Sequence, residues 1–302
     1  MTICVPDEVG KQELKDLPGV EVVVWGDDGP PPATVDGVQF LVPPYVLSAM
    51  TPELLAGLPE LRVIQLLSAG VEPWLDRVPD GVVLCNGRGI HGASTAELAV
   101  AGLLSVLRQL PRYHVEQVAH RWTPGRTDGL DRKRVLVLGA GDIGRRVAAA
   151  VEVFDAAATL VARRPRDGVA PMSALGELLP VHDVVVVALP HTPETHGLVD
   201  AAFLAALPDG AVVVNVARGQ LLDTDALLAE LVAGRLRAFL DVTEPEPLPP
   251  DHPLWGAPNV LITPHVGGGT SGWERRAYHL VREQVIRFRD GEPLENVVSA
   301  GY

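Results

Sequence analysis

The sequence is poor in several features, and each shortage narrows the class of protein. Cysteine occurs only twice in 302 residues, as Cys4 and Cys85 inside apolar runs. We therefore expect two buried thiols of a cytoplasmic protein and no disulfide. Neither a basic segment nor a following apolar segment opens the chain, so we expect no signal peptide. No apolar run approaches the roughly 18 residues of a membrane span, and we expect no membrane contact.

Positive charge is also in short supply. The 25 lysines and arginines face 38 aspartates and glutamates, which leaves a net charge of −13. Such a surface repels nucleic acid and anionic membranes, so we expect neither as a partner. Histidine, cysteine and aspartate are nowhere grouped with the spacing of zinc ligands, and we expect no metal.

The chain is rich in short apolar runs that alternate with helical patterns. This alternation predicts an α/β fold with parallel sheets. The expected strands are Thr2–Val5, Val20–Trp25, Val38–Val42, Arg62–Leu67 and Val82–Cys85, followed by Val135–Leu138, Ala157–Val161, Asp183–Leu189, Ala211–Val216, Leu236–Leu240 and Val260–Ile262.

Two long helices suggest how the chain is organised. Ser94 and Glu97 form a capping-box pattern that opens a long apolar helix, Ala96–Leu110. A last helix, Trp273–Arg289, has periodic apolar positions that suggest packing against the N-terminal part of the chain.

We therefore expect two domains, one inserted into the other. The first comprises residues 1–92 and 271–302, and the second comprises residues 93–270. Hinges would lie near Gly92 and Gly267–Gly272, with a ligand cleft between the domains.

A glycine-rich turn is the most informative feature of the second domain. The apolar run Arg134–Leu138 leads into a Gly-x-Gly-x-x-Gly motif formed by Gly139, Gly141 and Gly144, and a helical pattern, Arg145–Phe154, follows. In such motifs the strand turns sharply at the first glycine, a pyrophosphate approaches the backbone at the second, and the helix packs closely at the third. The helix N-terminus offers N–H groups and a positive dipole end to the phosphates. We expect a dinucleotide here, and the alternative is a glycine-rich turn that binds nothing.

The following strand indicates which dinucleotide is bound. An NAD site usually has an acidic residue about 20 positions past the glycines, which binds the ribose 2′-hydroxyl. Here Ala162 stands 23 positions after Gly139, and Arg163, Arg164 and Arg166 follow it. Guanidinium groups bind a 2′-phosphate that a carboxylate would repel. We expect NADP(H) to be preferred, with NAD(H) possible, and the alternative is an arginine-rich loop that is merely solvated.

Polar residues follow three further strands of the second domain. Arg218 comes after one strand, Glu246 after the next and His265 after the third, with Glu244 as second choice for the glutamate. The carboxyl ends of strands in a doubly wound sheet form its ligand crevice, so these side chains should meet there. The arginine would bind a carboxylate and polarise the adjacent carbonyl, the histidine would exchange a proton, and the glutamate would orient the ring and stabilise its charge. The alternatives are a surface arginine, a solvated glutamate and a histidine that only caps a strand.

The chain resembles the D-isomer specific 2-hydroxyacid dehydrogenase family. Five segments carry the resemblance, in the order Gly139–Gly144, Leu189–Thr195, Asn215–Asp223, Asp241–Leu248 and Pro253–His265. The resemblance implies a Rossmann-type dinucleotide-binding domain inserted into a flavodoxin-like substrate domain. It also implies an NAD(P)-dependent oxidoreductase that acts on the CH–OH group of a small 2-hydroxy acid, and a homodimer.

The resemblance assigns roles to individual residues. The implied catalytic residues are Arg218, Glu246 and His265. Asp241 and the Ala217 backbone would hold the nicotinamide amide. The implied cofactor-binding residues are Gly139, Gly141, Asp142, Ile143, Gly144, Arg163, Arg164, Leu189, Pro190, Thr195, Val216, Ala217, Asp241, His265 and Gly267. The implied substrate-binding residues are Ser68, Ala69 and Gly70, whose backbone would hold the substrate carboxylate, together with Arg218 and His265.

The arginines after Ala162 are similar to those of NADPH-preferring glyoxylate and hydroxypyruvate reductases. We therefore expect reduction of a small 2-oxo acid, such as glyoxylate or hydroxypyruvate, to the D-2-hydroxy acid with NADPH. One alternative is an NAD-linked, phosphoglycerate-type dehydrogenase, and another is a non-catalytic protein that senses the cofactor. The linker Arg121–Asp131 is short for the family, which weakens the expectation of a dimer-forming excursion at that point.

The remaining histidines and one loop complete the expectations. We interpret His91 as structural, His191 as a possible neighbour of the cofactor pyrophosphate, and His182 and His196 as surface residues. The loop Val42–Leu47 would help to shape the pocket for the substrate side chain.

Overall fold

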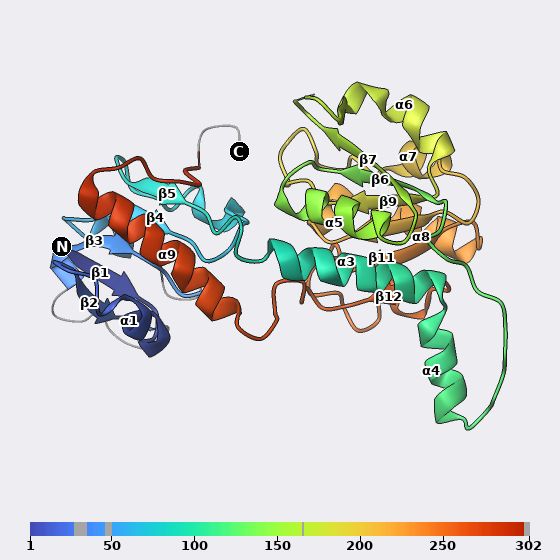
Figure 1. Ribbon diagram of the computed structural model, residues 1–302, viewed down its shortest axis with the longest axis horizontal. Helices are drawn as coiled ribbons and strands as arrows, with labels where there is room; N and C mark the ends of the chain where they lie inside the picture. Colours follow the sequence, from blue (N-terminus) through green and yellow to red (C-terminus); the bar gives the residue numbers. More distant parts are fainter. Residues whose placement is uncertain (27–34, 46–49, 165, 299–302) are drawn as a thin grey trace. The chain divides into compact units, whose positions relative to one another are not determined.

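The computed structural model (Figure 1) describes residues 1–26, 35–45, 50–164 and 166–298. The chain divides into two compact units. Unit 1 comprises Met1–His91 and Thr270–Tyr302, and unit 2 comprises Gly92–Gly269. These limits fall within one residue of the expected domain boundaries, while the role of each unit stays a prediction. Val46 and Leu47 of the expected side-chain pocket lie outside the described residues.

Unit 1 is built on a five-stranded parallel sheet with the order β2-β1-β3-β4-β5. This is the flavodoxin-like order that we predicted. Apolar residues of α9 pack with those of β1, β3 and β4, as the periodicity of this last helix predicted. Its elements are β1 (Thr2–Val5), α1 (Glu8–Leu14), β2 (Glu21–Val24), β3 (Val38–Leu41), α2 (Pro52–Ala56), β4 (Val63–Gln65), β5 (Val83–Cys85) and α9 (Trp273–Asp290).

Unit 2 is built on a seven-stranded parallel sheet with the order β12-β11-β10-β9-β6-β7-β8. The order reverses between β9 and β6, which is the doubly wound Rossmann arrangement that we predicted. Its elements are α3 (Gly92–Leu107), α4 (Leu110–Val118), β6 (Arg134–Leu138), α5 (Asp142–Glu152), β7 (Ala157–Ala162), β8 (Val169–Pro171), α6 (Leu175–Leu178), β9 (Val184–Val187), α7 (Ala201–Ala205), β10 (Val212–Asn215), α8 (Thr224–Val232), β11 (Arg237–Leu240) and β12 (Val260–Ile262).

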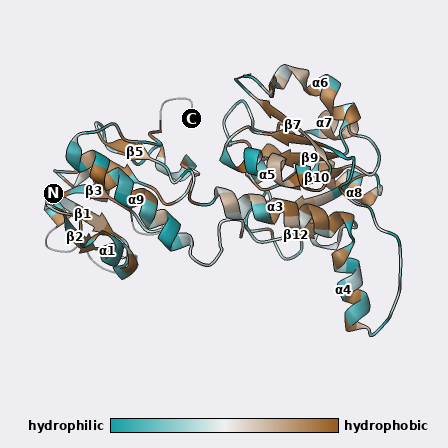
Figure 2. Cartoon of the chain, viewed as in Figure 1, coloured by the Kyte–Doolittle hydropathy of each residue, from teal (hydrophilic) through white to brown (hydrophobic). Residues whose placement is uncertain are grey.

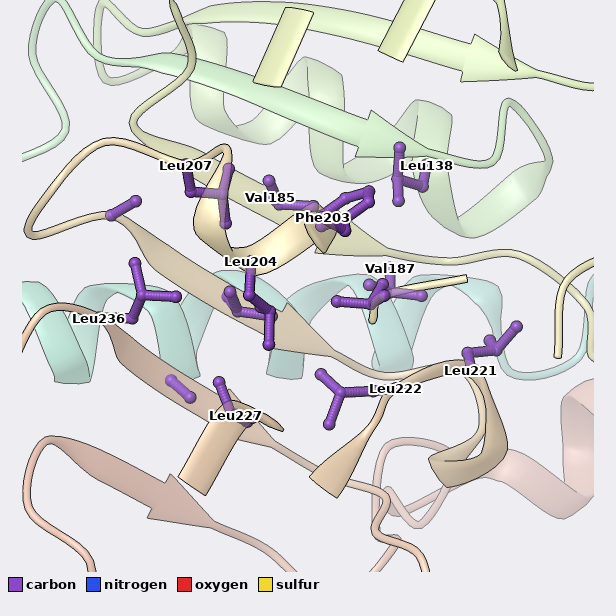
Figure 3. Packing of buried hydrophobic residues seen from close by; sticks show 14 of the residues in the cluster. Leu138, Val185, Val187, Phe203, Leu204, Leu207, Leu221, Leu222, Leu227 and Leu236 are labelled. Carbon is purple, nitrogen blue, oxygen red and sulfur yellow. The ribbon is translucent and has the colours of Figure 1, made fainter. Parts of the chain in front are cut away.

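Both faces of the unit 2 sheet are buried at its centre, which explains why its central strands are mostly apolar (Figure 2). Successive side chains of a strand point to opposite faces. In β9, Val185 and Val187 pack with α7 and α8, where Phe203 and Leu227 lie (Figure 3). Val184 and Val186 pack on the other face with α3 and α5. A one-residue slip of β9 would still bury valine, so the alignment of the sheet is fixed by its neighbours and turns.

The expected helix Ala96–Leu110 was wrong at both ends. The helix starts at Gly92, so Ser94 lies inside its first turn, because burial of that turn outweighs the local capping pattern. The helix ends at Leu107 because Pro111 cannot donate to the Leu107 carbonyl and would clash with it. Gln109 adopts a left-handed conformation with φ 53°, and the chain restarts as α4, which we did not predict.

The sequence analysis missed one strand. Strand β8 has only three residues and ends in a proline, as edge strands often do.

His182 is buried, which contradicts its interpretation as a surface residue. Its Nδ1 lies 2.6 Å from the Leu178 carbonyl and its Nε2 lies 3.0 Å from Thr159 Oγ1, so both nitrogens are satisfied.

The expected thiols are confirmed. Cys4 and Cys85 are both buried and unpaired with each other. Burial raises the pKa of the Cys4 thiol to about 12 and that of the Cys85 thiol to about 11, which makes both poor nucleophiles.

Candidate active site

Three loops meet at the carboxyl edge of the unit 2 sheet, after β10, β11 and β12. Backbone hydrogen bonds continue past the strand ends and tie these loops together. The Asp241 N–H donates to the Asn215 carbonyl at 2.9 Å, and the His265 N–H donates to the Asp241 carbonyl at 2.7 Å. The loops that carry Arg218, Glu246 and His265 therefore start side by side, as the crevice rule predicts.

His265 and Glu246 form a direct pair. His265 Nδ1 lies 2.5 Å from Glu246 Oε1, and both side chains are partly exposed. Glu244, the second choice, is instead held through its backbone, because its carbonyl accepts a hydrogen bond from Thr224 Oγ1 at 2.9 Å. With Nδ1 bound to the carboxylate, Nε2 is the atom through which His265 can exchange a proton with a ligand.

Asp241 organises the segment on which His265 lies. Its buried carboxylate accepts hydrogen bonds from Thr263 Oγ1 at 2.6 Å, from the Val266 N–H at 2.9 Å and from the Gly267 N–H at 2.8 Å. His265 itself has a positive φ of 53°, a conformation that the surrounding bonds must hold. A carboxylate offers about four acceptor positions, so room for a further donor remains. The implied contact of Asp241 with a nicotinamide amide stays a prediction.

Arg218 lies just beyond β10, in a turn that Asn215 stabilises. The buried Asn215 side chain accepts from the Ala217 N–H at 3.1 Å and donates to the Arg218 carbonyl at 2.9 Å. Sequence reasoning missed Asn215, although a polar residue that ends an apolar strand was the available signal. A Cβ atom at Gly219 would overlap the Thr243 carbonyl, so this turn packs directly against the loop that leads to Glu246. Val216 and Ala217 are buried in the same turn.

The glycine-rich turn has the geometry expected of each glycine. Gly139 has φ 114°, and a Cβ there would overlap the Ala188 carbonyl. A Cβ at Gly141 would meet nothing within 4 Å, so the backbone is open at this point. A Cβ at Gly144 would overlap the Gly139 carbonyl, because α5 packs tightly on the turn. Asp142 and Ile143 lie in the first turn of α5, where a helix has N–H groups without intrahelical acceptors. The turn therefore fits a pyrophosphate.

This contrast between two glycines gives a matched pair of variants. We expect Gly144→Ala to lower the free energy of unfolding by about 2 kcal/mol or more, because the added methyl group meets fixed backbone. We expect Gly141→Ala to leave stability within about 0.5 kcal/mol but to weaken dinucleotide binding about tenfold, because the methyl group fills the opening. Thermal unfolding and fluorescence titration with NADPH check both. Equal losses of stability in the two variants would contradict this geometry.

The arginines after β7 differ in their surroundings. Arg163 and Arg164 are exposed. Arg166 Nη2 instead donates to the Ala140 carbonyl at 2.6 Å, which attaches the arginine loop to the glycine-rich turn. The pKa of Glu194 is lowered mainly by its hydrogen bond with Thr192, and the positive charge of Arg163 lowers it further. Arg166 thus brings positive charge to the turn, whereas Arg163 lies near the acidic Glu194.

The loop after β9 holds the remaining expected cofactor contacts. Leu189 is buried, and Pro190 follows it at the surface. Thr195 Oγ1 donates to the Pro190 carbonyl at 2.8 Å and accepts from the Thr192 N–H at 2.8 Å, so its hydroxyl shapes the loop. His191 Nε2 lies 3.1 Å from Nδ1 of His196.

The expected carboxylate-binding residues lie in unit 1, at the carboxyl end of β4. Ser68 Oγ donates to the Gly70 carbonyl at 2.8 Å. Ser68 and Ala69 are partly exposed, and Gly70 is buried. Among the described residues, the structure gives no acceptor for the backbone N–H of Ser68 or of Gly70.

The described residues contain neither a metal-ligand cluster nor a membrane-spanning helix. In the part of the chain that the structure describes, no three histidine, cysteine or acidic side chains are grouped as metal ligands. Within the same residues, no helix is both long enough and apolar enough to cross a membrane.

Comparisons with known proteins identify the family and several relatives of this chain. The model of the NAD binding domain of D-isomer specific 2-hydroxyacid dehydrogenases matches residues 100–267. A glyoxylate/hydroxypyruvate reductase A from Klebsiella pneumoniae is 33% identical over 301 residues, which cover 94% of this chain and 92% of that protein. A D-3-phosphoglycerate dehydrogenase from Mycobacterium bovis is 35% identical over 265 residues, 82% of this chain and 49% of that protein. The structure of an NADPH-dependent glyoxylate/hydroxypyruvate reductase from Sinorhizobium meliloti, in complex with NADP and sulfate, is 30% identical, covers 100% of this chain and 99% of that chain, and has a TM-score of 0.83.

Proposed function

The chain belongs to the D-isomer specific 2-hydroxyacid dehydrogenase family of NAD(P)-dependent oxidoreductases, and on that premise we propose that it reduces a small 2-oxo acid to the D-2-hydroxy acid with NADPH. The observation that carries the proposal is the His265–Glu246 pair on a loop held by Asp241, beside the loop of Arg218. A protein that only sensed the cofactor would need the glycine-rich turn alone, so this pair argues against the non-catalytic alternative.

The cofactor would be held along the carboxyl edge of the unit 2 sheet. We assign its pyrophosphate to Gly139–Gly144, its adenosine to Leu189 and Pro190, and its nicotinamide amide to Asp241 and the Ala217 backbone. When bound, the nicotinamide supplies the hydride to the substrate carbon.

The protein's own residues bind the substrate and manage the proton. The Arg218 guanidinium binds the substrate carboxylate through two N–H groups and polarises the neighbouring carbonyl. Nε2 of protonated His265 donates the proton that the carbonyl oxygen takes up as hydride adds to its carbon. Glu246 fixes the ring through Nδ1 and stabilises its positive charge. In unit 1, we assign carboxylate binding to the backbone N–H groups of Ser68 and Gly70, for which the described residues give no acceptor.

Glyoxylate and hydroxypyruvate are the substrates that we propose first. The names of the Klebsiella and Sinorhizobium relatives support them. The Mycobacterium relative keeps an NAD-linked, phosphoglycerate-type activity as the second candidate, although this chain spans about half of that protein. Loss of NADPH absorbance at 340 nm, with a panel of 2-oxo acids that includes 3-phosphohydroxypyruvate, distinguishes the two. Turnover of no 2-oxo acid with either cofactor would refute the proposal.

We propose that Arg163 gives the preference for NADP(H) over NAD(H). We expect Arg163→Ala to lower kcat/KM for NADPH about tenfold or more and to leave the value for NADH within about twofold, because only NADPH offers a 2′-phosphate to the guanidinium. Arg132→Ala, at an exposed arginine on another turn, is the control. Steady-state kinetics with both cofactors check this. Equal or better use of NADH by the wild type would refute the preference.

We propose a homodimer that forms through α4 and the segment after it. Leu110, Val115 and Val118 each have at least half of their surface exposed, and Trp122 is 96% exposed. None of the residues of α4 is buried, and the helix extends away from the rest of unit 2 (Figure 1). Apolar surface of this kind is typical of an interface with a second copy.

The dimer can be tested with a tryptophan variant. We expect Trp122→Ser to raise the dimer dissociation constant about tenfold or more, because a large apolar anchor is lost. Trp255→Ser, at another tryptophan with half of its surface exposed, should leave it unchanged. Light scattering over a concentration series measures both. A monomeric wild type would overturn the proposal.

We also propose a cytoplasmic location. Two buried, unpaired thiols suit a reducing compartment.

A further inference from the structure

The segment that follows β4 has nearly all of its carbonyl groups bound. The Leu67 carbonyl accepts from His91 Nε2 at 3.0 Å, and the Ser68 carbonyl accepts from the Gly87 N–H at 2.6 Å. The Gly70 carbonyl accepts from Ser68 Oγ at 2.8 Å. All of these groups belong to unit 1. A carbonyl oxygen that turned outward would repel a carboxylate, so bonds that hold these oxygens favour anion binding by the N–H groups of the same segment.

Gln65 supplies the hydrogen bond to the Leu66 carbonyl, at the point where β4 and β5 diverge. The last regular bond of the ladder runs from the Leu66 N–H to the Cys85 carbonyl at 2.8 Å. In a regular parallel ladder the Gly87 N–H would next bind the Leu66 carbonyl, but it reaches Ser68 instead. Gln65 Nε2 fills this gap, because it donates to the Leu66 carbonyl at 2.9 Å and to the Asn86 carbonyl at 3.0 Å.

Gln284, on α9, sets the orientation of the Gln65 amide. Its Nε2 donates to Gln65 Oε1 at 2.9 Å and to the Glu295 carbonyl at 2.7 Å, and its Oε1 accepts from the Glu295 N–H at 2.9 Å. Gln65 is 0% exposed and Gln284 is 1% exposed. If the Gln65 amide were flipped, its oxygen would face the Leu66 and Asn86 carbonyls, which cannot donate. Its NH2 group must therefore face these two carbonyls.

We propose that Gln65 is a positioning residue for substrate binding, and that Gln284 fixes the amide through which it acts. The amide holds the Leu66–Gly70 segment in the conformation in which the N–H groups of Ser68 and Gly70 bind the substrate carboxylate. This rests on the proposed function, because it takes that segment as the carboxylate site. A preorganised loop pays its ordering cost on folding, so the effect falls on substrate affinity.

Kinetics and stability together test the proposal. We expect Gln65→Leu to raise KM for hydroxypyruvate about tenfold, with kcat within about threefold and the NADPH dissociation constant unchanged. Binding of oxamate, a 2-oxo acid isostere, to the NADPH-loaded enzyme should weaken by the same factor in calorimetry. Ser68→Ala removes the bond to the Gly70 carbonyl at a partly exposed site, and it should raise KM severalfold without a change in Tm.

A double variant distinguishes a role of Gln65 in substrate binding from a role in protein stability alone. Gln284→Leu leaves Gln65 Oε1 and both backbone groups of Glu295 without partners and should lower Tm. Gln65→Leu combined with Gln284→Leu also frees the Leu66 and Asn86 carbonyls but removes the unpaired Oε1, so it should lower Tm by less than the two single effects added together. The proposal requires KM to stay raised in the double variant. It is overturned if KM in the double variant equals the wild-type value, or if oxamate binding is unchanged in Gln65→Leu and Ser68→Ala. Absence of turnover in the wild type would overturn the proposed function itself.

Discussion

Replacing His265 by asparagine should lower kcat for 2-oxo acid reduction about a thousandfold, within the range that general acid catalysis supplies. Asparagine keeps a polar side chain but cannot deliver a proton to the carbonyl oxygen. The partner carboxylate of Glu246, now 2.5 Å from Nδ1, would remain in place. Because the pair lies at a partly exposed edge, we expect Tm to change by no more than about 2 °C.

The His265 prediction has two internal checks. The NADPH dissociation constant, measured by fluorescence titration, should stay within about threefold, because the glycine-rich turn is untouched. His279→Asn, at an exposed histidine on α9, should leave kcat unchanged. A kcat for His265→Asn within tenfold of the wild type would mean that the proton comes from another group.

Replacing Arg218 by lysine should lower kcat/KM for 2-oxo acids about a thousandfold. Lysine keeps the positive charge, but it has neither the planar fork that binds a carboxylate through two bonds nor the reach to the adjacent carbonyl at the same time. The turn itself should survive, because Asn215 holds it through backbone groups of Ala217 and Arg218. We therefore expect an unchanged Tm and an unchanged NADPH dissociation constant.

Arg132→Lys is the matched control for Arg218→Lys, since Arg132 is an exposed arginine away from the sheet edge. Steady-state kinetics with glyoxylate and hydroxypyruvate give the comparison. If kcat/KM for Arg218→Lys fell less than tenfold, the substrate carboxylate would have to be bound mainly by groups other than Arg218.

Much of the fold could be predicted because its signals are local and repeated. The strands Thr2–Val5 and Val260–Ile262 were predicted to the residue, and the others differ mostly at their ends. The three glycines of the turn were also predictable in their separate roles, because each role follows from the absence of a Cβ atom. The order of the strands followed from the family resemblance and from the alternation of strand and helix.

The end of α3 and the burial of His182 were not predicted, because they depend on individual residues and not on a repeated pattern. The break at Gln109 depends on Pro111 and on a left-handed residue that could as well have been placed elsewhere. The burial of His182 depends on partners at Leu178 and Thr159, of which one is distant in sequence. Bonds between remote groups leave no periodic pattern in a sequence.

In the candidate site, residues at strand ends were predictable, whereas residues that position others were not. Arg218, Glu246 and His265 follow strand ends, so a rule about sheet edges could find them. The contact of Asp241 with the nicotinamide stays a prediction, and its observed bonds, which the sequence did not indicate, hold the loop of His265. Gln65 was not singled out at all, because its partner Gln284 lies 219 positions away in the chain. Residues that position others are found only when the fold brings them together.

The most direct measurement follows cofactor and product in the same reaction. Purified protein is mixed with NADPH and hydroxypyruvate, absorbance at 340 nm is recorded, and the product is separated on a chiral column. If Arg218, His265 and Glu246 act around one nicotinamide, we expect one NADPH to be oxidised for each glycerate formed. We also expect the D-isomer to be the sole product. Formation of the L-isomer, a racemic product, or tight NADPH binding without oxidation by any 2-oxo acid would contradict the account.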